Sequence, residues 1–140
     1  YEDLSIFKIY CLDVGLLRVL SELSPEAYLN DSPAFKEYKG ALAENYILQS
    51  LLANGINCSR YWASGNKAEV EFIVQHGVDV VPIEVKSGKS VTGRSLIEYN
   101  KKYSPSLRVR FSMLNLKRDG TLVNIPLFLA DRVKDLCRIV

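Results

Sequence analysis

The chain has 140 residues, of which 48% are hydrophobic and 24% charged, and its formal net charge is +2. That length fits one domain with a substantial core, and the composition is typical of an ordinary soluble globular protein. Its apolar runs are shorter than the roughly 18 to 20 residues of a membrane span, and no signal peptide is visible, so we expect a cytoplasmic protein without a membrane partner. The first residue is tyrosine rather than methionine, so we expect a piece of a longer protein. The three cysteines are odd in number and widely spaced, which predicts reduced thiols rather than a zinc site.

The small net charge hides a strong asymmetry along the chain. Residues 1–85 carry six basic and twelve acidic side chains, a net charge of −6, whereas residues 86–118 carry nine basic and one acidic, a net charge of +8. Such a basic stretch favours binding to a polyanion. The alternative is a solvated face that neutralises the acidic first half of the same molecule. The candidate nucleic-acid contacts in the basic stretch are Lys89, Arg94, Lys101 and Lys102.

The first thirty residues are expected to form an appendage at the junction with an absent part of the protein, and residues 31–140 the main domain. Two helix starts are visible in the appendage, because an aspartate and a Ser-Pro pair each stand where a helix cap is expected. The predicted elements are a strand over Phe7–Leu12, a helix over Val14–Leu23 capped by Asp13, and a helical turn over Glu26–Leu29 after Ser24 and Pro25.

The main domain begins with the strongest helix signal of the sequence. Ser32 and Pro33 form a cap followed by a first-turn proline, and the helix should run to about Ala53, where Asn54 and Gly55 end it. The later helices and strands alternate, which predicts an α/β sandwich around a mixed sheet. These elements are a strand over Asn57–Trp62, a loop over Ala63–Ala68, a hairpin of Val70–Val74 and Val78–Val85, a helix over Arg94–Tyr103, a strand over Leu107–Leu114, a turn over Arg118–Gly120, a strand over Thr121–Ile125 and a helix over Leu127–Cys137.

The hairpin concentrates ionisable residues. Gly77 supplies the positive φ of a two-residue turn, and with Gly77 and Val78 in the loop we expect the pairs Gln75 with Val80, Ile73 with Pro82, Glu71 with Glu84 and Glu69 with Lys86. Glu71 and Glu84 would then converge, with Lys86 on the same side as Glu84 because side chains alternate along a strand. Such a carboxylate pair is tolerated when a cation lies between its members, when one is protonated, or when water screens both. Two carboxylates and a lysine can place a divalent metal and a water nucleophile beside a phosphodiester.

Glu44 is an anomaly of the long predicted helix. Its neighbours three and four positions away are Gly40, Ala41, Ile47 and Leu48, so it emerges from a mainly apolar face. A buried carboxylate needs a partner or a raised pKa. We therefore expect Glu44 to point toward the hairpin. The alternative is a residue at the helix edge that reaches water or an arginine.

Four segments of the chain, in order, resemble a known family. KIYCLDVGLL, GALAENYI, YWASGNKAEVEFIV and PIEVKSGK are similar to the domain of unknown function that forms the C-terminal part of many prokaryotic AAA-type ATPases. The resemblance covers nearly the whole chain, and its helix, EVEFIV and IEVKSGK parts look like the PD-(D/E)XK nuclease superfamily. That superfamily implies a restriction-endonuclease-like fold with one site shared by Glu44, Glu71, Glu84 and Lys86. Glu71 stands where the family usually has aspartate, and its longer side chain would shift a bound metal.

These residues and the resemblance predict a divalent-metal-dependent phosphodiesterase that acts on nucleic acid. Glu71 and Glu84 would hold Mg²⁺ or Mn²⁺ with the Val85 carbonyl, Lys86 would activate the attacking water, and Glu44 would bind a second ion or its water shell. The sequence has no P-loop of the form GxxxxGK[ST], so an ATPase site would belong to another domain of the full-length protein. The alternative is a non-catalytic regulatory, protein-interaction or DNA-binding domain, in which these side chains form a buried structural ion network.

Overall fold

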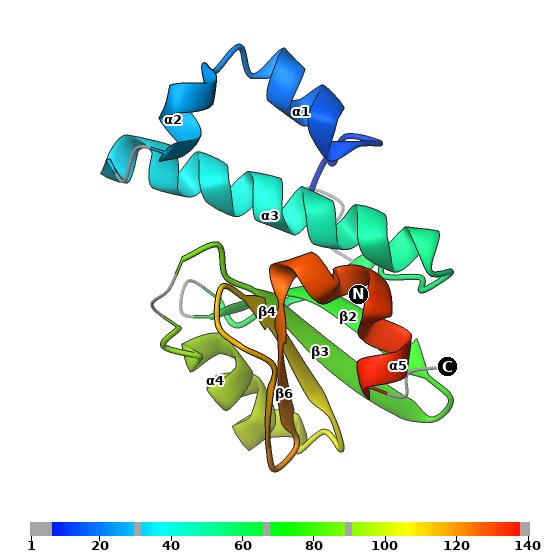
Figure 1. Ribbon diagram of the computed structural model, residues 1–140. Helices are drawn as coiled ribbons and strands as arrows, with labels where there is room; N and C mark the ends of the chain where they lie inside the picture. Colours follow the sequence, from blue (N-terminus) through cyan, green and yellow to red (C-terminus); the bar gives the residue numbers. More distant parts are fainter. Residues whose placement is uncertain (1–6, 30–31, 66–67, 89–90, 138–140) are drawn as a thin grey trace.

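A computed structural model describes residues 7–29, 32–65, 68–88 and 91–137 (Figure 1). They form one mixed sheet of six strands in the order β1-β2-β3-β4-β6-β5, with helices on both faces. The predicted α/β class with a mixed sheet is therefore confirmed. The elements are α1 (Val14–Leu20), α2 (Pro25–Leu29), α3 (Pro33–Ala53), β1 (Arg60–Ala63), β2 (Glu69–His76), β3 (Asp79–Val85), α4 (Arg94–Tyr103), β4 (Arg108–Ser112), β5 (Lys117–Asp119), β6 (Leu122–Pro126), the 3₁₀-helix η1 (Leu127–Arg132) and α5 (Val133–Cys137).

The first helices form where their caps predict. The Asp13 carboxylate accepts hydrogen bonds from the backbone N–H groups of Gly15 and Leu16 at 2.7 and 3.1 Å, which satisfies donors that α1 cannot pair internally. Helix α1 ends at Leu20 rather than Leu23, because Glu22 takes a left-handed backbone conformation with φ +53°. Helix α2 follows the predicted Ser-Pro start.

The predicted strand over Phe7–Leu12 is wrong. Residues 7–13 form no strand, and a side chain takes the place of a neighbouring strand. The Asn45 amide of α3 accepts a hydrogen bond from the Cys11 N–H at 2.9 Å and donates one to the Cys11 carbonyl at 3.2 Å. The backbone N–H and C=O groups of Cys11 are therefore paired with a helix side chain rather than with a neighbouring strand.

Helix α3 spans the predicted residues and carries the core on one of its faces. Ile47 and Leu51 are fully buried against the sheet, and Gly55, with φ +69°, ends the helix as expected. The same face of the sheet is covered by η1 and α5, while α4 covers the other face (Figure 1). On the α4 side, Leu96 and Tyr99 pack with Val70.

The central hairpin forms in the predicted register near its turn. Gln75 pairs with Val80 and Ile73 with Pro82, and Gly77 has φ +60°. Because the Lys86 N–H donates to β4 and N–H directions alternate, the missing N–H of Pro82 also faces the β4 side. The β3–β4 pairs begin one residue later, with Ile83, so the proline costs the ladder no bond.

Three later expectations are corrected. Strand β1 begins at Arg60 rather than Asn57, and the predicted turn at Arg118 contains the exposed edge strand β5, whose polar residues conceal its pairing with β6. The predicted C-terminal helix is split into η1 and α5. Ala130 and Val133 are both buried and lie three residues apart, a spacing that a 3₁₀ turn brings onto one face.

Two phenylalanines test the placement of the core. Phe111 of β4 is fully buried and Phe128 of η1 is 76% exposed. Phe111→Ala should lower the free energy of unfolding by about 3 to 5 kcal/mol, because it removes packed apolar surface and leaves a cavity. The matched change Phe128→Ala should alter it by less than about 0.5 kcal/mol. Urea unfolding followed by circular dichroism measures both, and equal losses would contradict this core.

Candidate functional site

Glu71 and Glu84 come together with Lys86, and these three residues are called the carboxylate–lysine cluster below. The Lys86 ammonium nitrogen lies 3.8 Å from Glu71 Oε1 and 3.4 Å from Glu84 Oε1. Glu71 projects from β2, Glu84 from β3, and Lys86 directly follows β3. The structure thus brings the three predicted residues together, and the ammonium is the cation that two neighbouring carboxylates require.

The strand pairing follows the expected register but ends before the cluster. The described β2–β3 pairs run from His76↔Asp79 to Phe72↔Ile83, so the predicted pairs of Glu71 with Glu84 and of Glu69 with Lys86 are not among them. The β1–β2 register shifts by one residue between Arg60↔Ile73 and Trp62↔Val70, which is a β-bulge beside Glu71. The Val85 N–H instead donates to Glu71 Oε2 at 3.0 Å. A carboxylate therefore extends the hydrogen bonding between the two strands.

Burial changes the proton affinity of Glu71. Desolvation raises the pKa of Glu71 to about 7, although Lys86 and the Val85 N–H favour the charged form. Its side chain is 14% exposed. At neutral pH this carboxyl group therefore exchanges between its protonated and charged forms, which was one of the three conditions for tolerating the pair.

Glu84 is the most enclosed member of the cluster. Its side chain is fully buried, and Arg110 Nε donates to Glu84 Oε2 at 3.1 Å. Among the described residues none donates a hydrogen bond to Glu84 Oε1, so the 3.4 Å contact with Lys86 is an ion pair without hydrogen-bond geometry. One buried carboxylate oxygen is therefore left with spare capacity to accept.

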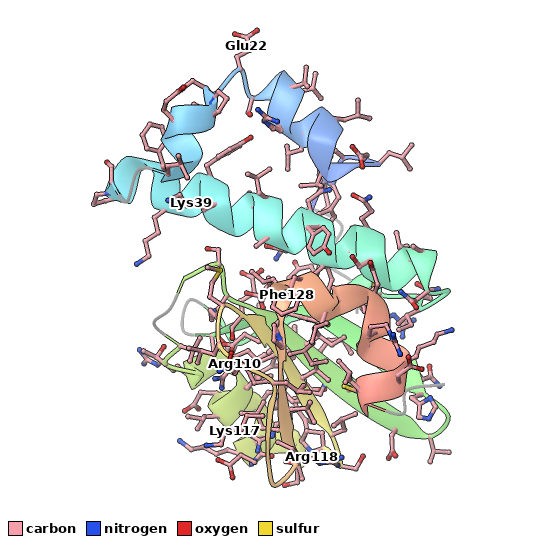
Figure 2. The ribbon with its side chains drawn as sticks, viewed as in Figure 1. Glu22, Lys39, Arg110, Lys117, Arg118 and Phe128 are labelled. Atoms are coloured by element: carbon pink, nitrogen blue, oxygen red, sulfur yellow. The ribbon has the colours of Figure 1, made fainter. Side chains whose placement is uncertain are left out.

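Sequence reasoning missed Arg110 as a member of this site. It counted Arg110 only as part of the basic stretch, yet the parallel β3–β4 register places it directly beside Glu84 (Figure 2 labels Arg110). Space for it comes from Gly93 at the start of α4. A Cβ on Gly93 would lie 2.7 Å from Arg110 Nη2, and Gly93 has φ +58°. Lack of a side chain at Gly93 therefore helps to hold the guanidinium against Glu84.

Glu44 lies in a second set of contacts. Its Oε1 accepts a hydrogen bond from Lys8 Nζ at 2.9 Å and a short one from the Tyr10 hydroxyl, and Lys8 also forms a short ion pair with Glu69 of β2. Burial lowers the pKa of Lys8, but Glu69 and Glu44 outweigh it, so the pKa is raised. Burial, and then Glu44, raise the pKa of Tyr10. Glu44 thus reaches the hairpin strand β2 through a lysine.

Lys8 and Tyr10 were also missed by sequence reasoning. They stand two residues apart and both bind Glu44. In the predicted strand, alternation would have placed both side chains on one side. That spacing was a signal that could have found them. The segment was predicted to belong to an appendage outside the main domain, so no contact with Glu44 was expected.

The predicted nucleic-acid contacts lie on α4. Arg94 is its first residue, and Lys101 and Lys102 lie in its last turn, where positive charge is favourable to the helix dipole. Lys101 pairs with Glu98 at 3.0 Å, and the Lys102 ammonium lies 5.1 Å from the Tyr103 ring centroid. Lys89 falls outside the described residues. These contacts give two of the four candidates a local structural role.

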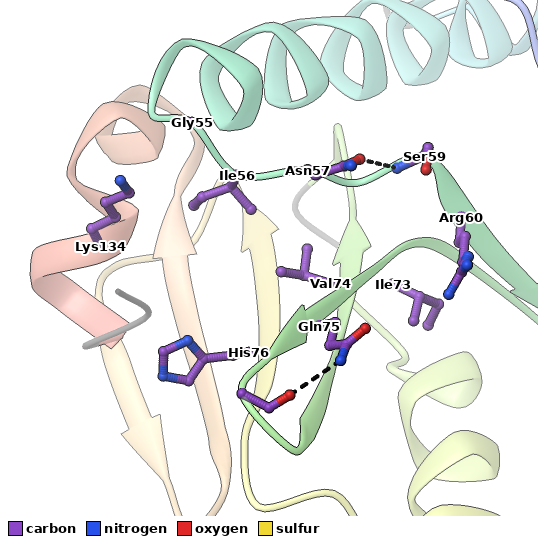
Figure 3. Close-up of a pocket in the computed structure, with 11 residues that line it drawn as sticks. Gly55, Ile56, Asn57, Ser59, Arg60, Ile73, Val74, Gln75, His76 and Lys134 are labelled. Atoms are coloured by element: carbon purple, nitrogen blue, oxygen red, sulfur yellow. Dashed lines mark hydrogen bonds between the residues drawn. The ribbon is translucent and has the colours of Figure 1, made fainter.

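A cavity of about 530 Å³ lies at the other end of β2 and is shown in Figure 3. It is lined by the loop after α3, by the end of β2 and by Lys134 of α5, with His76 at the hairpin tip. None of the predicted site residues lines it. The candidate chemistry is therefore not in this cavity.

The cluster suits one divalent cation better than two. Mg²⁺ is commonly bound through one or two carboxylates together with water and substrate phosphate, and Glu71 and Glu84 supply such oxygen donors, with the free Glu84 Oε1 as the clearest one. Glu44 does not join them. Within the described ranges, no group of three or more acidic, histidine or cysteine residues is close enough to hold a metal. Lys8 and Tyr10 occupy the Glu44 carboxylate instead.

Fold and site together define an α/β domain with a carboxylate–lysine cluster beside its central hairpin. Residues 39–128 match the family DUF4143, a domain of unknown function, and the chain belongs to that family. The expected domain of unknown function is thus confirmed. Comparisons with curated proteins and with solved structures found no match. Of the helices in the described part of the chain, none combines the length and apolar character that crossing a membrane requires.

The contribution of the space beside Gly93 to stability can be measured by comparison with a second glycine, Gly77. Gly77→Ala and Gly93→Ala both place a side chain at positive φ, which costs roughly 1 to 2 kcal/mol, but only the second must displace Arg110. The tip of a long side chain usually yields, yet this one is held by Glu84. Gly93→Ala should therefore lower the free energy of unfolding by about 1 to 3 kcal/mol more than Gly77→Ala, measured by urea unfolding. Equal losses would mean that Arg110 moves without penalty.

The pKa of Glu71 predicts a pH-dependent stability. A folded-state pKa of about 7 against the usual 4.5 means that the folded protein holds a proton that the unfolded chain has released, so its stability falls between about pH 4.5 and 7. Glu71→Gln removes the ionisable group and with it this loss of stability. Relative to wild type, the free energy of unfolding of the variant should rise by about 3 kcal/mol between pH 4.5 and 7. Urea unfolding at a series of pH values measures the difference, and parallel profiles would exclude the raised pKa.

Proposed function

We propose that this domain has the restriction-endonuclease-like fold of PD-(D/E)XK nucleases and is a divalent-metal-dependent phosphodiesterase module that acts on nucleic acid. It would work as part of a longer protein with an AAA-type ATPase domain. The observation that carries this proposal is the buried Glu84 Oε1, which lacks a hydrogen-bond donor among the described residues and lies beside Glu71 and Lys86. A carboxylate pair with one free buried oxygen is suited to a cation.

Each residue of the cluster has a role in this proposal. Glu71 and Glu84 hold one Mg²⁺ or Mn²⁺, helped by the Val85 carbonyl. Such an ion lowers the pKa of a bound water and offsets phosphate charge. Because the Lys86 ammonium now lies against Glu84 Oε1, it must move aside when the ion binds, and it is then free to orient water or to stabilise the phosphoryl group. Arg110 pairs with Glu84 and holds it in place from the neighbouring strand.

The basic stretch supports a polyanionic substrate only in part. Lys86 and Arg110 pair with Glu84, and Lys101 pairs with Glu98, so these charges serve internal balance. Lys117 and Arg118 are exposed on the edge strand β5, and Lys117 lines a cavity of about 400 Å³ together with Arg110 (Figure 2). In this proposal the nucleic-acid backbone approaches the sheet on the side that bears Arg110.

A second candidate function is favoured by the ion pairs themselves. Arg110 and Lys86 neutralise Glu84, and Lys8 bridges Glu44 and Glu69, so the acidic groups already have cations from the same chain. In a regulatory or interaction domain of an ATPase, these residues would serve only to form the ion pairs that stabilise the fold. Breaking a buried pair would then lower stability without loss of any activity.

Lys86 separates the two candidates. In the phosphodiesterase, Lys86→Ala should abolish cleavage of single- and double-stranded DNA but leave Mn²⁺ binding intact, because it removes the competing ammonium and keeps both carboxylates. Glu84→Gln should lose both. Isothermal titration with Mn²⁺ and Mg²⁺, together with cleavage assays on DNA and RNA, makes the measurement.

Lys36→Ala is the matched control, since this exposed lysine of α3 is not among the candidate site residues. It should change neither cation binding nor cleavage. If the wild-type domain binds neither ion at millimolar concentration and leaves every nucleic acid intact, the regulatory function becomes the better conclusion.

A further inference from the structure

The cavity of about 530 Å³ at the hairpin-tip end of β2 lies where the pairing of β1 with β2 stops (Figure 3). The described β1–β2 pairs end at Arg60↔Ile73, whereas β2 continues to His76. The loop that leads from α3 into β1 lines the cavity, and α5 adds Lys134. Ligand pockets span roughly 300 to 1,000 Å³, so this cavity has the size of a binding site for a small molecule.

The charged side chains that line the cavity are basic. Arg60, His76 and Lys134 come from three separate elements, β1, β2 and α5, and no described aspartate or glutamate lines the cavity. In Figure 3, Lys134 and His76 lie on one side of the cavity and Arg60 on the other. Basic groups in a concave site raise the local concentration of anions. The lining therefore favours a ligand with more than one negative charge.

Neighbouring acidic residues do not neutralise this lining. Asp135, next to Lys134, pairs with Arg132 at 2.8 Å. Asp79, the strand partner of His76, is exposed and does not line the cavity. Of the ion pairs between described residues, none includes the three basic residues of the cavity. Since Lys134 and His76 are also half-buried, an anion in the cavity would supply the countercharge that the protein does not.

The rest of the lining offers contacts to a larger body than a phosphate group. Asn57 Oδ1 accepts a hydrogen bond from the Ser59 N–H at 3.3 Å, and Gln75 Nε2 donates to the Gly77 carbonyl at 3.2 Å. In the described contacts these bonds leave Asn57 Nδ2 as a donor and Gln75 Oε1 as an acceptor. The hydrophobic residues of the lining are Ile56, Ile73 and Val74. A planar ring with polar edges uses both the apolar surface and the two amides.

We propose that this cavity is a binding site for a nucleoside diphosphate. Its phosphates bind Lys134 and His76, and its base lies against the apolar lining, with its edge toward Asn57 and Gln75. The Arg60 guanidinium, on the other side of the cavity, is suited to stack on the face of the base. The site is separate from the carboxylate–lysine cluster, so it does not depend on the proposed function.

The test measures binding of ADP, GDP, CDP and UDP by isothermal titration, with pyrophosphate and a single-stranded thymidine oligonucleotide as comparison ligands. Lys134→Gln and Arg60→Gln each remove one positive charge, from different sides of the cavity. Lys36→Gln is the matched control, because Lys36 is an exposed lysine of α3 that does not line the cavity. Backbone amide shifts in two-dimensional NMR spectra locate the bound ligand, and circular dichroism checks the fold of each variant.

At least one nucleoside diphosphate should bind more tightly than pyrophosphate and shift the amides of residues 57–60 and 74–76. Lys134→Gln should weaken this binding by about ten- to a hundredfold, because it removes a hydrogen bond between charged groups. Arg60→Gln should weaken it several-fold, and Lys36→Gln should leave it unchanged.

Four results would overturn the proposal. The first is the absence of amide shifts at the cavity with every nucleoside diphosphate at millimolar concentration. The second is pyrophosphate binding as tight as that of all four, since the cavity would then recognise no nucleoside. Shifts at the cavity with the oligonucleotide alone would assign the basic lining to a nucleic-acid surface. Equal losses in Lys134→Gln and Lys36→Gln would reduce the binding to an effect of overall charge.

Discussion

The buried carboxylate of Glu84 is the constraint on which the centre of the sheet depends. A fully buried charge would cost several kcal/mol if it were left unpaired. Arg110 supplies the countercharge from β4, at a distance of 3.1 Å, and the parallel pairing of β3 with β4 is what aligns the two side chains. Gly93 leaves room for the guanidinium. The strand order, the start of α4 and the ion pair of Glu84 with Arg110 therefore support one another.

Much of the fold could be predicted because its signals are local. Asp13, the Ser-Pro pairs and Gly55 mark helix ends, and Gly77 sets the hairpin turn and the first pairs of its register. The partner of Glu84 could not be found in this way. It comes from a parallel strand 26 residues later, and the choice of parallel neighbour is made by packing of whole elements rather than by residues near Glu84.

The sequence predicted which residues belong to the candidate site better than it predicted the contacts between them. The apolar surroundings of Glu44 correctly suggested a carboxylate in need of a partner, but that partner is Lys8, in a segment first interpreted as a strand. The β2–β3 pairs follow the expected register but end at Phe72↔Ile83, and Glu71 accepts a hydrogen bond from the Val85 N–H instead of pairing with Glu84. Sequence pattern identifies such side chains as unusual, whereas tertiary contacts decide what they bind.

The free oxygen of Glu84 is the best guide to which function this arrangement serves. A purely structural ion pair gains most when all of its acceptors are satisfied, and an apolar pair of similar volume is often as stable. Here Arg110 satisfies Oε2, whereas among the described residues Oε1 has only the Lys86 ammonium, without hydrogen-bond geometry. Lys86 is 30% exposed and sits on the outer side of the buried carboxylate, so it can withdraw. In the proposed phosphodiesterase, Lys86 and a cation would exchange places at the carboxylate that Arg110 anchors.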